Sequence, residues 1–139
     1  MSFSATSTFP PSISRSGLTL EELHILTGIP ANLLEGYAAG RFKPAEVERE
    51  VLTDLGRSID RMTGVSLTSY LDKCRFRLLR RIIPRGDVDR LLGLRDLGDY
   101  HEALLNLCEL HRDELEKAIV KTARRSGYDP ARREANPAD

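Results

Sequence analysis

The fold of this chain is decided by residues 18–44, which read LTLEELHILTGIPANLLEGYAAGRFKP. Thr19 followed by Glu22 is a capping-box pattern, in which a hydroxyl and a carboxylate satisfy free backbone amides at the start of a helix. Gly28 permits the left-handed backbone conformation that ends such a helix. A second short helix is expected over residues 31–39. The stretch therefore predicts two short helices joined by a tight turn.

The rest of the chain also has helical periodicity. Four more helices are expected, over residues 44–62, 66–83, 87–92 and 100–125. Pro84 ends the second of these, because a proline pushes the residue before it out of helical geometry. Asp99 and Glu102 form another capping-box pattern before the longest helix. No segment alternates as a half-buried strand does, so the sequence predicts an all-α fold, a compact bundle of about six helices.

The two ends of the chain differ from its middle in composition. Residues 1–17 are rich in Ser, Thr and Pro, and we expect a disordered arm or, at most, a docked extended arm. Residues 128–139 are predicted to form a disordered tail, because the periodicity is lost there. Between the ends, we expect one helical region over 18–64 and a second over 65–127.

The overall composition is that of an ordinary globular protein, with 40% hydrophobic and 30% charged residues and no formal net charge. Any attraction to nucleic acid or to an acidic membrane must therefore be local. The chain has no apolar run long enough to span a bilayer, and its start lacks the features of a signal peptide. We therefore expect a cytoplasmic protein whose two cysteines are reduced and buried.

Charge is sorted along the chain. The net charge is −4 over residues 21–60, +6 over 61–86, −6 over 87–116 and +3 over 117–139. Five basic residues share one sector of the predicted helix at 66–83 or extend it: Lys73, Arg77, Arg80, Arg81 and Arg85. This basic sector either contacts phosphates or packs beside the acidic segments, within the chain or across a dimer. Arg75 falls near the apolar sector, so we expect it to pair with a carboxylate or to snorkel.

The spacing of five residues in the opening stretch is that of a helix-turn-helix: Leu23, Gly28, Ile29, Leu34 and Tyr37. The stretch resembles the core of the Cro/CI-type (Xre) repressors and of the MerR-type activators. The resemblance covers 27 of the 139 residues, and five or six positions carry it.

The resemblance implies which residues meet DNA. In those families, outward residues near the start of the second helix reach base edges. Here they correspond to Pro30, Ala31, Asn32, Leu33, Glu35 and Gly36. Asn32 is suited to adenine, and Glu35 is suited to the amino group of cytosine. Arg41 and Lys43, just beyond the helix, are suited to phosphates. The first hypothesis is therefore a small DNA-binding transcriptional regulator, with residues 87–125 as a helical dimerisation region.

A second hypothesis follows from the same stretch. The second helix holds one acid and no base, and His24 stands where the families usually keep a small residue. A helix-turn-helix reused for protein contact would have this composition. The alternative is therefore an all-helical adaptor or accessory protein that binds a protein partner through complementary charged faces and no DNA. The basic sector distinguishes the two: it shares a face with Asn32 and Arg41 in the first, and acidic helices cover it in the second.

Residues that could support catalysis or metal binding are few. The chain has no glycine-rich phosphate loop, no nucleophile elbow and no helical pair of histidines with a glutamate base. We therefore expect no enzymatic activity and no cofactor. Cys108 and His111 are three residues apart, and His101 and Cys74 could join them around zinc. Because single spacings of this kind are common by chance, no metal site is predicted.

Overall fold

A computed structural model describes residues 7–62 and 64–128. Within these ranges the helices are α1 (Pro11–Arg15), α2 (Leu20–Thr27), α3 (Ala31–Ala38), α4 (Glu46–Asp60), α5 (Gly64–Leu79), α6 (Arg85–Leu92), α7 (Leu97–Leu110) and α8 (Arg112–Arg125). The described part contains no strand, so the prediction of an all-α fold is confirmed, but the number of helices there is eight and not six. None of these helices is both long and apolar enough to cross a bilayer.

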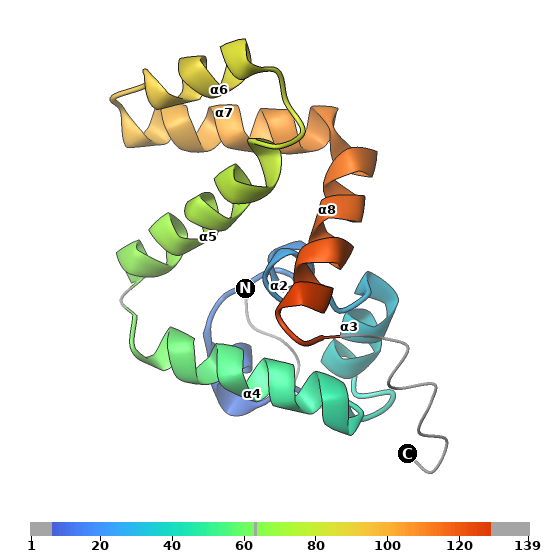
Figure 1. The fold of residues 1–139 in the computed structure, drawn as a ribbon. Helices are drawn as coiled ribbons and strands as arrows, with labels where there is room; N and C mark the ends of the chain where they lie inside the picture. The colour runs from blue at the N-terminus through green and yellow to red at the C-terminus, as the bar shows by residue number, and fades with distance from the viewer. Residues whose placement is uncertain (1–6, 63, 129–139) are drawn as a thin grey trace.

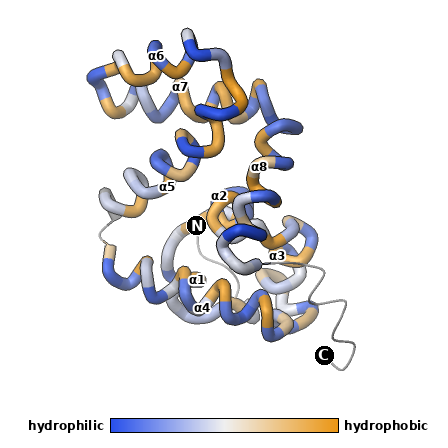
Figure 2. The backbone as a smooth tube through the Cα atoms, viewed as in Figure 1, coloured by the Kyte–Doolittle hydropathy of each residue, from blue (hydrophilic) through white to orange (hydrophobic). Residues whose placement is uncertain are grey.

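The helices form two groups joined by a pair of connecting helices (Figure 1). Helices α1 to α4 pack around one core at one end of the molecule, and α6 lies along α7 at the other end. Helices α5 and α8 run between the two groups and contact each other and α2. Hydrophobic and hydrophilic residues alternate along these helices (Figure 2), as expected for helices with one buried face.

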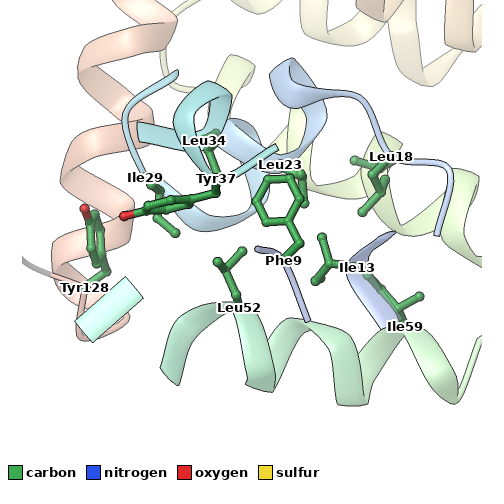
Figure 3. Close-up of a cluster of buried hydrophobic side chains, with 11 residues drawn as sticks. Phe9, Ile13, Leu18, Leu23, Ile29, Leu34, Tyr37, Leu52, Ile59 and Tyr128 are labelled. Carbon is green, nitrogen blue, oxygen red and sulfur yellow. The ribbon is translucent and has the colours of Figure 1, made fainter. Parts of the chain in front are cut away.

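The first core lies between α1, α2, α3 and α4 (Figure 3). Its buried members are Phe9, Ile13, Leu18, Leu23, Ile29, Leu34, Tyr37, Leu52, Ile59, Leu71 and Tyr128. Tyr37 is fully buried, with its ring edge-on to Phe9 and its hydroxyl donating to the Glu48 carboxylate at 3.3 Å. Glu48 is itself fully buried, so the core of α4 includes one acid that the apolar periodicity did not indicate.

The two ends of the described chain depart from the predicted disorder. Within the arm predicted over 1–17, α1 packs on α4, and Ile13 and Phe9 are buried in the first core. The arm is helical because Pro11 starts α1 with a backbone already suited to a first turn, and because Ile13 has an apolar surface to bury. Tyr128, placed in the predicted tail, is also buried in the first core. Residues 1–6 and 129–139 lie outside the described residues.

The second core joins α5, α6, α7 and α8. Its buried members are Leu78, Leu79, Ile83, Leu91, Leu104, Cys108, Leu115 and Ile119. Beside it, Arg75 is buried and pairs with Asp72 at 3.1 Å and with Glu22 of α2 at 3.7 Å. Of the two alternatives expected for Arg75, pairing with a carboxylate is the one that the structure shows. The paired charges tie α5 to α2 where the two cores meet.

The prediction of a single long helix over 100–125 is wrong. The chain leaves helical geometry at His111, so two helices, α7 and α8, form instead. The division is invisible in the periodicity, since Cys108 and Leu115 on either side of it face the same core. The start is also earlier than predicted: the Asp96 side chain accepts from the Asp99 amide at 2.9 Å and caps α7.

Candidate nucleic-acid interface

Helices α2 and α3 are the two short helices expected from residues 18–44, and they pack against each other. The Thr19 hydroxyl accepts from the Glu22 amide at 3.1 Å, and the Glu22 carboxylate accepts from the Thr19 amide at 2.9 Å, so the predicted capping box is confirmed. Gly28 has a φ of +78°, which confirms the predicted left-handed end of α2. A Cβ at Gly28 would also overlap the side chain of Ala123, because α8 packs directly on the turn.

His24 joins the turn to α8. Its Nδ1 atom lies 2.7 Å from the Ile29 carbonyl oxygen, and its Nε2 atom lies 2.7 Å from Oε2 of Glu116 on α8. The two ring nitrogens thus contact the turn on one side and α8 on the other. The histidine that stands in place of a small residue therefore fixes α8 against the α2–α3 turn.

The outer face of α3 is smaller than the resemblance implied. Ala31, Asn32 and Glu35 are exposed to solvent. Leu33, predicted to face bases, packs instead against the first core. Gly36 is buried because the Phe42 ring covers it, and a Cβ there would overlap that ring.

Two of the predicted phosphate contacts lie just past α3. Arg41 and Lys43 are both exposed. Arg41 lies 3.7 Å from the Glu35 carboxylate, with both side chains more than half exposed. Such an exposed pair is weak, so Arg41 is available to exchange the carboxylate for a phosphate.

The stronger concentration of positive charge lies elsewhere, in a groove bordered by α5, the turn after it, α8 and the end of α2. We call it the arginine groove. Its lining residues are Ile25, Leu26, Tyr70, Cys74, Arg77, Leu78, Arg80, Arg81, Thr122, Arg125 and Ser126. The groove has a volume of about 360 Å³. None of these lining residues, all of which the structure describes, carries a carboxylate.

The four arginines of the groove are exposed, and none forms an ion pair with another described residue. Three hydroxyl groups lie among them, on Tyr70, Thr122 and Ser126. Burial raises the pKa of the Tyr70 hydroxyl, and the neighbouring Cys74 raises that pKa further. The hydroxyl therefore stays protonated at neutral pH and remains a hydrogen-bond donor. The groove thus combines fixed positive charge with neutral donors.

The structure assembles part of the predicted basic sector. Arg77, Arg80 and Arg81 line the groove, whereas Lys73 is exposed outside its lining. Arg85 opens α6 and lies 4.0 Å from Asp89. Sequence reasoning missed Arg125, which α8 brings to the groove. The signal available for it was the net charge of +3 over residues 117–139.

The groove and the outer face of α3 are separate surfaces. No residue of α3 lines the groove, and α8 runs between α5 and α3 (Figure 1). The acidic helices α6 and α7 also contribute no lining residue. The groove is therefore lined neither by the helix proposed to meet bases nor by the acidic helices.

The potential metal ligands have other roles. The His101 ring lies 2.9 Å from the Asp72 carboxylate, and Cys108 is buried in the second core. Burial raises the pKa of the Cys108 thiol to about 11, so it is protonated and a poor metal ligand at neutral pH. Among the described residues, no three His, Cys, Asp or Glu side chains are grouped as metal ligands would be.

Comparison with known proteins found no match to this chain among protein-family models, curated proteins or solved structures. Function is therefore inferred from the shape and charge of the two surfaces.

Proposed function

We propose that the protein is a small cytoplasmic DNA-binding regulator, in which the arginine groove holds backbone phosphates and the outer face of α3 meets base edges. One observation carries the proposal: four exposed arginines from two separate parts of the chain line one groove without a carboxylate among them. A single exposed arginine is ordinary. Four around one groove without a carboxylate concentrate positive charge, which suits an anionic ligand.

The chemistry of the groove suits phosphates. A guanidinium group donates two parallel hydrogen bonds to a phosphate, and such charge-assisted bonds are stronger than neutral ones. The hydroxyls of Thr122 and Ser126 add donors that recognise phosphate oxygens. A phosphate polymer gains more than a single anion does, because each neutralised phosphate releases condensed counterions.

The part proposed for α3 is to discriminate between sequences. Asn32 is exposed near the start of the helix, where an amide side chain can make paired hydrogen bonds to adenine. Because the outer face of α3 has little positive charge of its own, it contributes little affinity without phosphate contacts elsewhere. In this proposal the arginine groove supplies most of the affinity for DNA, and α3 supplies the sequence preference.

The test compares affinities of matched variants for duplex DNA by fluorescence anisotropy. The double variant Arg77→Ala with Arg81→Ala removes two groove charges and is expected to weaken binding to every sequence by tenfold or more, about 1.4 kcal/mol. The control is Arg49→Ala with Arg57→Ala, which removes two exposed arginines from α4. Equal losses in the two double variants would show that only total charge matters and would overturn the role of the groove.

The contribution of α3 needs a separate readout. Duplexes selected from a random pool by the parent protein are compared with unselected duplexes. Asn32→Ala is expected to reduce the preference for selected duplexes while leaving affinity for unselected ones unchanged, since a base contact typically contributes about 1–3 kcal/mol of discrimination. A parent protein that selects no sequence from the pool would contradict the reading role of α3.

A further inference from the structure

A second groove lies between α6 and α7, at the opposite end of the molecule from α4 (Figure 1). It has a volume of about 390 Å³, and its lining residues are Asp87, Arg90, Leu91, Leu94, Asp99, Glu102, Ala103, Asn106 and Leu107. Leu91, Leu94, Ala103 and Leu107 belong to the second core or pack against it. The groove therefore has an apolar floor that opens to the surface.

Exposed leucines surround the same pair of helices. Of the five large hydrophobic side chains that are exposed in the described residues, four belong to α6 and α7: Leu92, Leu97, Leu105 and Leu110. Leu97 and Leu110 are 79% and 75% exposed. None of these four leucines lines the groove itself. Single exposed leucines are ordinary, but several on one pair of helices indicate an interaction surface.

The rim of the groove is acidic. Asp87 lies 3.7 Å from Arg90 and is partly neutralised. Asp99 and Glu102 are exposed, and neither side chain forms an ion pair within the described residues. The surrounding segment, residues 87–116, has a net charge of −6. A partner that covers the floor must therefore bring positive charge to this rim.

We propose that the α6–α7 groove binds an amphipathic helix of a partner protein, with an apolar stripe flanked by lysine and arginine. A helix is the natural occupant of an apolar groove between two helices, because its side chains one turn apart enter the groove together. The charge argues against a second copy of this chain, because a two-fold contact through the groove brings two acidic rims together. This surface is independent of the arginine groove and of DNA binding.

The experiment measures binding of two labelled helical peptides by fluorescence anisotropy. One peptide consists of leucine and lysine in an amphipathic pattern, and the other has glutamate in place of lysine. The leucine–lysine peptide is expected to bind the full-length protein, and the leucine–glutamate peptide is expected to bind at least tenfold more weakly. Comparable binding of both peptides, or of neither, overturns the proposal.

Matched variants locate the binding. Asp99→Asn with Glu102→Gln neutralises the rim and is expected to weaken binding of the leucine–lysine peptide about tenfold. The control, Glu46→Gln with Glu50→Gln on α4, is expected to leave the affinity for this peptide unchanged. Circular dichroism checks that both double variants keep the parent's helicity. Equal weakening in the two pairs overturns the proposal, because it shows non-specific attraction. Analytical sedimentation gives a further test. If the parent sediments as a dimer and Asp99→Asn with Glu102→Gln dissociates it, the proposal is overturned, because a second copy then fills the groove.

Discussion

Gly28 satisfies two constraints at one residue, a φ of +78° and close contact with Ala123 of α8. Gly28→Ala is therefore expected to lose roughly 1–2 kcal/mol of unfolding free energy from the left-handed backbone, and about 1–3 kcal/mol more from overpacking. Gly17→Ala is the control, because Gly17 has a φ of +80° and nothing within 4 Å of an added Cβ. Urea denaturation of both variants makes the comparison. Equal losses would contradict the packing of α8 on the turn.

The thiol of Cys108 gives a second prediction for a single residue. Burial disfavours the thiolate and raises the pKa of this thiol from 9.0 to about 11. Because the thiolate is the reactive form, alkylation of Cys108 is expected to be slow near neutral pH in the folded protein and fast in denaturant. The Cys108 thiol therefore contributes to the free energy of unfolding below pH 9.0, the pKa of the thiol in the unfolded chain. This contribution is lost as the pH rises from 9.0 to about 11.

Iodoacetamide labelling followed by mass spectrometry measures this reactivity, and the Cys74→Ser variant isolates Cys108. The rate is expected to rise as the pH approaches the raised pKa. A native rate at neutral pH equal to that of a free cysteine would contradict the burial of this thiol.

At the scale of elements, the docking of α1 is the feature that composition did not predict. Ile13 is fully buried against α4 and neighbouring residues, so Ile13→Ala is expected to lower the unfolding free energy by about 2–5 kcal/mol. Arg15→Ala changes an exposed residue of the same helix and is expected to stay within about 0.5 kcal/mol of the parent. Thermal or urea unfolding measures both. No loss in Ile13→Ala would indicate that the arm is undocked.

The elements that could be predicted are those with local signals. Thr19 and Glu22 cap α2 through side chains three residues apart, and Gly28 ends it through its own backbone. The docking of α1 depends on a surface formed by α4, which is distant in the sequence. The Ser- and Pro-rich composition of residues 1–17 therefore could not predict it. No glycine or proline marks the break at His111. The apolar periodicity continues unbroken from α7 into α8, so it predicted one helix.

At the scale of the whole molecule, the candidate site was predicted only in part. Helical periodicity places Arg77 in the basic sector of α5, but Arg81 lies in the turn after Leu79, so that turn sets its position beside Arg77. The partnership with Arg125 depends on the fold of α8 back against α5, which no local pattern encodes. The separation of the groove from Asn32 is likewise a property of the assembled helices. The residues of 18–44 predicted two short helices and the turn between them, but not the helices that pack on them.

The central claim is that the arginine groove holds DNA phosphates, and the dependence of affinity on salt tests it most directly. A plot of log affinity against log salt concentration has a slope of about −0.9 for each phosphate neutralised on duplex DNA. The parent is expected to give a steep slope, and Arg77→Ala with Arg81→Ala is expected to flatten it by roughly two units. An unchanged slope in this double variant, or no binding by the parent at low salt, would contradict the claim.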